Sequence, residues 1–261
     1  MSVLAAPVAA GAGCPVPADG SVGWVHSWDL STGVDGPGTR LVFFLSGCAM
    51  RCLYCQNPDT WRRTDGGETP IERVEQLITR YQPFISVAGG GFTLSGGEPL
   101  QQPAFTKRAL QAATDAGLHT AIDTSGFLGR RADDELLDAT DLVLLDIKAG
   151  TDEGHRRLTG RPIGPTLEFA RRLADREQAT WVRYVLVPGY TDRTVELDTF
   201  IAIVAELANV QRVDILPFHK LGAPKYEKLG IRFPLADTPP AGPELVAEVR
   251  ERMLAGGLPV V

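Results

Sequence analysis

Short apolar runs alternate along the chain with longer segments in which apolar residues recur every three or four positions. The runs are typical of buried strands, and the longer segments are typical of amphipathic helices. We expect six strands, at residues 41–46, 91–94, 119–123, 142–147, 180–187 and 212–216. We expect helices at residues 71–81, 103–116, 133–139, 167–177, 195–207 and 244–254. Most of these strands are almost continuously apolar, as strands buried on both faces of a parallel sheet are.

This alternation of strand and helix predicts an α/β fold built from βαβ units with parallel strands. The pattern alone allows either an open doubly wound sheet or a barrel, and six units favour a partial (β/α)6 TIM-like barrel. In both architectures functional groups gather at the carboxyl ends of the strands. Polar residues stand at these ends in the present chain: Ser95, Asp123, Asp146 and Lys148.

The length of the chain, 261 residues, is ordinary for one α/β barrel, so we expect residues 23–261 to form a single domain. Residues 1–22 are rich in Ala, Gly and Pro, and no Lys or Arg precedes their apolar stretch, so a disordered tail is expected rather than a signal peptide. No apolar run approaches the roughly 20 residues of a membrane-spanning helix. A net charge of −6 without a Lys/Arg-rich run argues against a nucleic-acid partner. These features predict a cytoplasmic protein with no membrane role.

Three of the four cysteines lie within eight positions, directly after the first predicted strand: Cys48, Cys52 and Cys55. So few cysteines in a long chain do not form the dense disulfide framework of a small secreted domain. Three thiolates from one loop can instead converge on one face of an iron–sulfur cluster and leave one iron without a cysteine. An iron with an open position can bind a small molecule and transfer an electron to it.

The spacing of the cysteines leaves two other interpretations open, a zinc site and unrelated buried thiols. Cys14 lies outside this spacing. It could supply a fourth thiolate, but an incidental cysteine is the better interpretation.

The three cysteines are followed by a specific order of further motifs. The chain carries VHS at 25–27, VDGPG at 34–38, CLYC at 52–55, SGGE at 95–98, DTSGF at 123–127, LDIK at 145–148, RYVLVPG at 183–189 and LPFH at 216–219. In this order the chain resembles the radical S-adenosylmethionine (radical SAM) superfamily and, more narrowly, the family of pyruvate formate-lyase activating enzymes. The likeness runs from about residue 23 to the C-terminus, and it implies the radical SAM fold.

The resemblance implies an activity, two cofactors and protein partners. A [4Fe-4S] cluster held by the three cysteines would cleave S-adenosylmethionine to methionine and a 5'-deoxyadenosyl radical, which generates a glycyl radical on pyruvate formate-lyase under anaerobic conditions. The cluster and cofactor supply this chemistry, so no catalytic acid or base is required. Flavodoxin or ferredoxin would donate the electron, and a monomer is expected.

The resemblance also implies roles for individual residues. Gly96, Gly97 and Glu98 would bind the methionine amino group, for which a carboxylate is a suitable partner. The residues that surround the cofactor would include Asp123, Thr124, Asp146 and Lys148. A monovalent cation would lie near the carboxylate of the cofactor. Contacts with the adenosine part would come from Tyr54, Gln56, Arg183 and His219. The opening through which the glycine loop of the protein substrate enters would be bordered by Asp35, Gly36, Pro37 and Gly38. Relatives often carry His or Asn where Gln56 stands, so this position departs from the family pattern.

Several of these residues also have simpler structural interpretations. Asp123 can cap a helix, residues 35–38 can form a tight turn, and His219 can be structural. Asp146 and Lys148 share one face of their strand, which favours a common inward site. Arg183 lies in an apolar strand, so we expect it to have a carboxylate partner, which would also be consistent with a purely structural ion pair.

Three other functions remain open from the sequence: activation of another glycyl radical enzyme, radical SAM modification of a small molecule, and a non-catalytic iron–sulfur or zinc protein. Activators of other glycyl radical enzymes commonly carry further cysteine motifs between the first cluster and the SGGE motif. No cysteine lies between Cys55 and Ser95 in this chain, which favours the pyruvate formate-lyase type.

Overall fold

The computed structural model describes residues 17–261. Most of the expected N-terminal tail, residues 1–22, lies outside the described residues, and so does Cys14. The part of the tail that is described begins with a turn in which the Gly20 amide donates to the Pro17 carbonyl over 3.1 Å, and its last residue, Val22, is the first residue of a strand.

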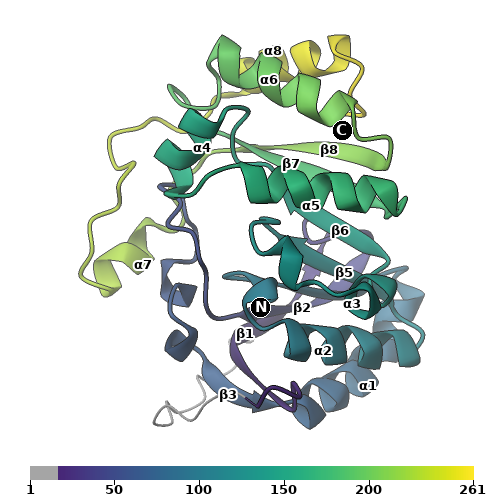
Figure 1. The fold of residues 1–261 in the computed structure, drawn as a ribbon. Coiled ribbons are helices and arrows are strands. Elements are labelled where there is room, and N and C mark those ends of the chain that lie inside the picture. The colour runs from purple at the N-terminus through teal and green to yellow at the C-terminus, as the bar shows by residue number, and fades with distance from the viewer. Residues whose placement is uncertain (1–16) are drawn as a thin grey trace. The chain divides into compact units, whose positions relative to one another are not determined.

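The described residues contain eight strands and eight α-helices (Figure 1). The strands are β1 (Val22–Thr32), β2 (Thr39–Leu45), β3 (Gly67–Pro70), β4 (Gly91–Gly96), β5 (His119–Thr124), β6 (Leu142–Asp146), β7 (Thr180–Leu186) and β8 (Val210–Pro217). The helices are α1 (Ile71–Val87), α2 (Pro103–Asp115), α3 (Asp134–Asp138), α4 (Asp152–Thr159), α5 (Gly164–Asp175), α6 (Thr194–Ala205), α7 (Ala223–Lys228) and α8 (Pro243–Ala255). The predicted α/β class is confirmed, because strands and helices alternate from β4 onwards.

The six predicted strands are confirmed as β2 and β4 to β8, and the six predicted helices as α1, α2, α3, α5, α6 and α8. The sequence analysis missed β1, β3, α4 and α7. Strand β1 buries only three consecutive residues, so it lacks the continuous apolar run of the other strands. Helix α4 has the sequence DEGHRRLT, in which the apolar periodicity is too short to detect. The expectation of parallel strands holds for most of the sheet, but β1 pairs antiparallel with both β2 and β3.

Two compact units make up the chain. The first contains residues up to 49, 60–124 and 130–144, with the strand order β3-β1-β2-β4-β5 followed by the start of β6. Strands β2, β4 and β5 are parallel, with Leu45 opposite Gly96 at one end and Gly91 opposite His119 at the other. Helices α1 and α2 pack against each other and against these strands (Figure 1). Strand β4 is buried along almost its whole length, as expected of a central parallel strand.

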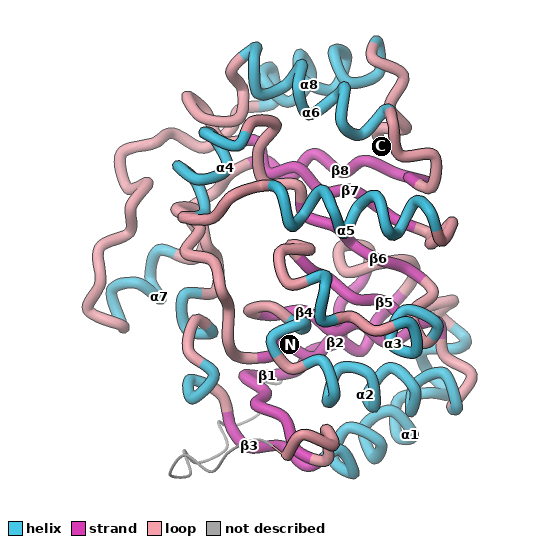
Figure 2. The backbone as a smooth tube through the Cα atoms, viewed as in Figure 1, coloured by secondary structure: helices cyan, strands magenta, loops and turns pink. Residues whose placement is uncertain are grey.

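The second unit contains residues 50–59, 125–129 and 145–261, with the end of β6 followed by β7 and β8. Strands β7 and β8 are parallel, and the C-terminal helix α8 packs against β8 and α6 (Figure 2). A ring pair in this unit, Tyr184 and Phe200, has its centroids 4.2 Å apart and joins β7 to α6. The core of the unit therefore lies between these strands and their helices.

The turn between β1 and β2 contains three glycines with positive φ angles, Gly33, Gly36 and Gly38, and the first and last of them have different surroundings. Gly38 has a φ of +68°, and a Cβ atom there would lie 2.3 Å from the carbonyl oxygen of Gly89. Gly33 has a φ of +82°, and a Cβ atom there would meet nothing within 4 Å. Both positions favour glycine for conformational reasons, but only Gly38 is also restricted by close packing.

We expect Gly38→Ala to lower the free energy of unfolding more than Gly33→Ala does. Each variant bears the cost of a left-handed backbone, about 1–2 kcal/mol, and only Gly38→Ala adds a clash with Gly89. Urea unfolding of the two variants and the wild type measures the difference. An equal decrease in the free energy of unfolding in the two variants would show that the turn does not pack on Gly89 as described.

Candidate active site

The loop that carries the cysteines begins where β2 ends, and its base is closed by backbone hydrogen bonds within the first unit. The Gly47 amide donates to the Thr60 carbonyl over 2.8 Å, and the Cys48 amide donates to the Trp61 carbonyl over 3.1 Å. The first cysteine is therefore fixed next to the point where the chain returns from the loop.

The rest of the loop, residues 50–59, belongs to the second unit and is held there from two sides. The Arg51 amide donates to the Thr159 carbonyl over 3.0 Å, and the Leu53 amide donates to the Leu158 carbonyl over 2.8 Å, both at the end of α4. The Tyr226 hydroxyl of α7 donates to the Cys55 carbonyl over 3.1 Å. Helices α4 and α7, which the sequence analysis missed, thus both support the cysteine loop.

The donor atoms of this loop suit an iron–sulfur cluster in kind. Cys48, Cys52 and Cys55 are all partly exposed, and three thiols are the soft ligands that such clusters take. Among residues 17–261 no group of three or more His, Cys, Asp or Glu side chains is gathered closely enough to hold a metal ion. The fit therefore rests on the chemistry of the three thiols and on the way the loop is anchored.

Gly96 and Gly97 allow the backbone after β4 to pass unusually close to the backbone after β2. A Cβ atom on Gly96 would lie 2.3 Å from the Leu45 nitrogen, and one on Gly97 would lie 2.5 Å from the Gly47 oxygen. The Gly97 amide donates to the Leu45 carbonyl over 2.8 Å, and the Glu98 amide donates to the Gly47 carbonyl over 2.9 Å. The SGGE segment is consequently bonded to the start of the cysteine loop.

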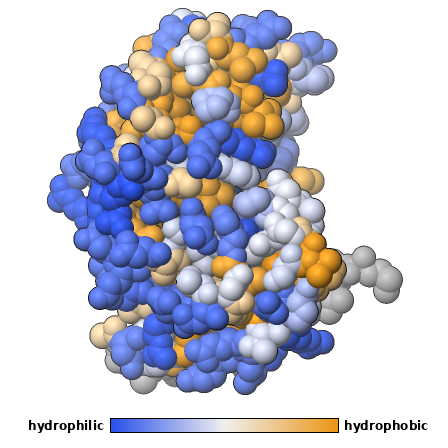
Figure 3. Space-filling view, turned by 90° about the vertical axis from the view of Figure 1, so that its right-hand side faces the viewer, coloured by the Kyte–Doolittle hydropathy of each residue, from blue (hydrophilic) through white to orange (hydrophobic). Residues whose placement is uncertain are grey.

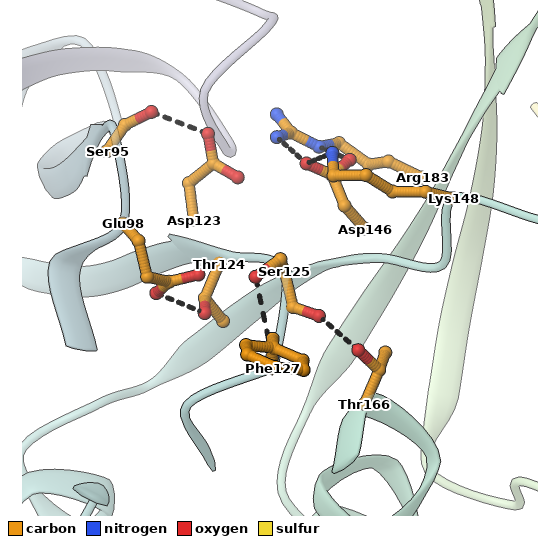
Figure 4. A network of polar contacts seen from close by, with 10 residues as sticks. All are labelled: Ser95, Glu98, Asp123, Thr124, Ser125, Phe127, Asp146, Lys148, Thr166 and Arg183. Carbon is orange, nitrogen blue, oxygen red and sulfur yellow. Dashed lines mark hydrogen bonds and ion pairs between the residues drawn. The ribbon is translucent and has the colours of Figure 1, made fainter. Parts of the chain in front are cut away.

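Two short side-chain hydrogen bonds link the ends of β4 and β5 (Figure 4). The Ser95 hydroxyl donates to Asp123 Oδ2 over 2.6 Å, and the Thr124 hydroxyl donates to Glu98 Oε1 over 2.6 Å. Glu98 is buried and also accepts from the Leu100 amide over 3.1 Å. The structure therefore brings together four polar residues after these strands: Ser95 and Asp123, which the sequence analysis expected at strand ends, and Glu98 and Thr124, which the family resemblance implied near the cofactor.

A second polar group, in the second unit, consists of one carboxylate and two cations (Figure 4). Asp146 Oδ2 accepts from Lys148 Nζ over 2.9 Å, and Asp146 Oδ1 accepts from Arg183 Nε over 3.2 Å. The prediction that Arg183 has a carboxylate partner is confirmed, and Asp146 and Lys148 do lie together. The group carries an excess of one positive charge, which suits an anionic ligand.

Burial and neighbouring charges shift the pKa values of Asp146 and Lys148 in opposite directions. Burial alone would raise the pKa of Asp146, but the Arg183 guanidinium and the Lys148 ammonium outweigh it and lower the pKa to about 2. Burial would lower the pKa of Lys148, but the Asp146 carboxylate holds it well above the ordinary value. At neutral pH all three side chains are therefore charged.

Three residues expected near adenosine lie in the second unit, in different environments. Tyr54 is buried, its ring centroid lies 5.8 Å from Lys148 Nζ, and its hydroxyl has no hydrogen-bond partner among residues 17–261. Gln56 uses its amide on the backbone, since Nε2 donates to the His219 carbonyl over 3.1 Å and Oε1 accepts from the Gly222 amide over 2.7 Å. The side chain of His219 is exposed rather than inward. Gln56 thus ties the segment of His219 to the cysteine loop.

The turn at Asp35, Gly36, Pro37 and Gly38 precedes β2, at the opposite end of the parallel strands from Glu98 and Asp123. It is fixed by the fully buried Arg40, whose Nε donates to Thr93 Oγ1 over 2.6 Å. The Thr93 hydroxyl in turn donates to the Asp35 carbonyl over 2.7 Å. The structure therefore does not bring residues 35–38 together with the polar groups after β4 and β5.

Sequence reasoning missed a buried carboxylate that shapes the loop after Lys148. Glu196 of α6 accepts from the amides of Gly150 and Thr151, over 3.0 and 2.9 Å, and from the Thr151 hydroxyl over 2.6 Å. Its partners are mostly backbone groups distant in sequence, so no motif marks it. Glu196 lies in the first turn of α6, where acidic residues are common and usually exposed, so the sequence gives no sign that this one is buried.

Helices in the described part of the chain are all too short or too polar to cross a bilayer. Hydrophilic residues cover much of the face drawn in Figure 3, with apolar residues between them. Among the described residues, the apolar side chains with the greatest exposed fraction include Val34, Val87 and Leu221.

We expect Asp146→Asn to lower the free energy of unfolding at pH 7 by about 3 kcal/mol, since it leaves two largely buried cations without their counter-charge. Because the folded pKa of Asp146 is depressed to about 2, its contribution is present above its ordinary value of 3.8 and is lost as the pH falls towards 2. The difference in the free energy of unfolding between the wild type and the variant should therefore become smaller below pH 4. Chemical denaturation at several pH values measures it.

Asp198→Asn is the matched control, because it breaks a single exposed pair with Arg252 of similar length, 2.7 Å. An exposed pair contributes at most about 1 kcal/mol. Equal losses in the two variants would contradict the buried charge group described above.

Residues 42–201 match the model of the radical SAM superfamily. The pyruvate formate-lyase 1-activating enzyme of Escherichia coli strain K12 is 40% identical over 232 residues, which cover 88% of this chain and 94% of the relative. The pyruvate formate-lyase-activating enzyme of Staphylococcus aureus strain USA300 is 41% identical over 246 residues, which cover 91% of this chain and 98% of the relative.

A solved structure shares the fold. The crystal structure of a domain of a pyruvate-formate lyase-activating enzyme from Bacteroides vulgatus ATCC 8482 aligns with a TM-score of 0.56 and 23% identity, covering 66% of this chain and 98% of that domain. The superfamily model spans more than half of this chain, and the two relatives are matched over nearly their whole length. The chain therefore belongs to the radical SAM superfamily and, within it, to the family of pyruvate formate-lyase activating enzymes.

Proposed function

We propose that this protein activates pyruvate formate-lyase in the cytoplasm of an anaerobic cell by generating a glycyl radical on it. The observation that carries the proposal is the 40% identity, over 94% of its length, to an enzyme named for this activation. The absence of cysteines between Cys55 and Ser95 supports the same choice of partner. Residues 23–261 would act as one domain in this function.

Membership of the superfamily implies a [4Fe-4S] cluster and S-adenosylmethionine. When bound, the cluster would supply the one electron needed to cleave S-adenosylmethionine reductively to methionine and a 5'-deoxyadenosyl radical, the species that would take a hydrogen atom from a glycine of the partner. Cys48, Cys52 and Cys55 would hold three irons of the cluster. The chain itself binds, orients and shields the reactants.

In the first unit, Gly96, Gly97 and Glu98 would bind the amino group of the cofactor. A carboxylate is the natural partner of an ammonium, and Glu98 is held in one rotamer by Thr124 and Leu100. Asp123, fixed by Ser95, would lie beside the cofactor. These short hydrogen bonds keep the carboxylates in place before a ligand arrives, which reduces the cost of ordering them on binding.

In the second unit, the excess positive charge of the Asp146, Lys148 and Arg183 group would attract the cofactor's carboxylate, with a monovalent cation beside it. Tyr54 would face the adenosine part, where its hydroxyl, which has no hydrogen-bond partner among residues 17–261, would donate a hydrogen bond. Gln56 would act indirectly, by holding the backbone at His219. His219 would reach adenosine with its exposed side chain.

The partner proteins are part of the same proposal. The turn at residues 35–38 would contact pyruvate formate-lyase away from the cofactor, a flavodoxin or ferredoxin would supply the electron, and the protein would act as a monomer. Arg40 and Thr93 hold the turn rigid, so it offers a preformed contact.

We expect Cys52→Ala to abolish uptake of the cluster and cleavage of S-adenosylmethionine. The wild type should contain about four irons per chain after anaerobic reconstitution, as one [4Fe-4S] cluster requires, and Cys14→Ala should match it. Cluster uptake is measured by iron analysis and by the EPR spectrum with and without S-adenosylmethionine. Cleavage of the cofactor is measured by the production of 5'-deoxyadenosine. Full cleavage by Cys52→Ala, or its loss in Cys14→Ala, would overturn the assignment of the ligands.

Incubation of the reconstituted protein with pyruvate formate-lyase, a reductant and S-adenosylmethionine should produce the EPR signal of a glycyl radical. A variant of the partner with its reactive glycine replaced by alanine is the control and should give no signal. Cleavage of S-adenosylmethionine without a glycyl radical, when a known activating enzyme succeeds on the same preparation, would redirect the proposal to another substrate.

A further inference from the structure

The C-terminal turn of α4 lies against the cysteine loop in the second unit. The carbonyls of Leu158 and Thr159 accept hydrogen bonds from the amides of Leu53 and Arg51, the two neighbours of Cys52. The conformation of this turn therefore determines where the backbone at Cys52 lies.

A buried histidine fixes the turn. His155 is fully buried, and its Nδ1 lies 2.7 Å from the Arg161 carbonyl oxygen, so Nδ1 carries the proton and donates. The Thr159 hydroxyl donates to the His155 carbonyl over 2.7 Å and accepts from the Arg161 amide over 3.1 Å. Gly160, with a φ of +75°, completes the reversal of the chain.

The other ring nitrogen of His155 shows that packing alone does not explain the residue. Nε2 is buried and has no hydrogen-bond partner among residues 17–261. An unpaired buried polar atom is unfavourable, and a leucine would fill similar space without this cost. Burial also lowers the pKa of His155, which keeps the ring neutral and leaves Nδ1–H as its one donor. The contribution of the imidazole is thus its hydrogen bond to Arg161.

We propose that His155 is a positioning residue for the cysteine loop, acting through the turn of α4 that it ties to Arg161. The inference rests on the proposed role of the cysteines as cluster ligands. A loop backbone that is held in place before the cluster arrives loses little freedom on binding it, and residues that orient the ligands from outside commonly strengthen metal binding in this way.

The test compares three variants. His155→Leu removes the donor, whereas His155→Asn keeps it, because the amide nitrogen of asparagine takes the place of Nδ1. Asn209→Leu is the matched control in the same unit: Asn209 Nδ2 also donates to a backbone carbonyl, that of Gln178, over 2.8 Å, and its Oδ1 is also buried without a partner. Asn209 lies at the opposite ends of β7 and β8 from Lys148, and its side-chain nitrogen bonds to Gln178 and Thr180 rather than to the cysteine loop.

Two measurements are made on each variant. In the protein without cluster, hydrogen–deuterium exchange at the amides of Arg51 and Leu53 reports whether the turn holds the loop. In the reconstituted protein, the rate of iron loss to a chelator reports how firmly the thiolates hold the cluster. We expect both rates to rise about tenfold in His155→Leu, the factor that corresponds to one lost hydrogen bond of about 1.4 kcal/mol. His155→Asn should stay near the wild type, and Asn209→Leu should change neither rate even if it lowers the unfolding temperature.

Equal changes in His155→Leu and Asn209→Leu, or none in His155→Leu, would overturn the inference. A failure of the proposed function is visible separately. If the wild type takes up no cluster, the cysteine assignment is wrong, while the exchange rates still decide whether His155 holds the loop.

Discussion

The close approach of two backbone segments, residues 45–47 and 96–98, is the constraint on which the first half of the site depends. Four hydrogen-bonding groups meet there, and the contact is possible only because positions 96 and 97 lack side chains. It fixes the end of β2, and therefore Cys48, relative to the end of β4, and therefore Glu98. Any side chain at Gly96 would have to displace the backbone at Leu45. The geometry of the site in this unit thus follows from the absence of two Cβ atoms.

In the second unit the cysteine loop is supported by different means. Its amides and carbonyls bond to the turn of α4 and to Tyr226 of α7, while Gln56 spans from the loop to the backbone at His219 and Gly222. These supports act on the main chain. Side chains of the loop take part as well, since Gln56 bonds through its amide and Lys225 Nζ donates to Asn57 Oδ1 and to Asp59 Oδ1.

The sequence was sufficient to predict an element or a contact wherever a local pattern of residues determines it. Strands such as β4 and β6 are buried on both faces, so their apolar runs revealed them, and the alternation at Asp146 and Lys148 correctly put both on one side. It was insufficient where the partner lies far along the chain. Glu196 and His155 bond mainly to backbone atoms whose positions depend on the whole fold, and nothing near them in sequence marks them. His219 was expected to contact adenosine, and its side chain is exposed because it lies beyond the end of β8, outside the sheet.

The placement of the turn at residues 35–38 has a consequence for how large a partner must be. From Gly91, beside this turn, to Gly96, beside the cysteine loop, β4 extends about 16 Å at about 3.3 Å per residue. A polypeptide that touches both ends must therefore be a folded surface or an extended segment of about six residues or more, as long as β4 itself. Recognition would then be bivalent: anchoring at the remote turn raises the effective concentration of the reactive segment at the other end without altering its chemistry. A short peptide, lacking the remote anchor, would bind weakly and yet react normally once bound.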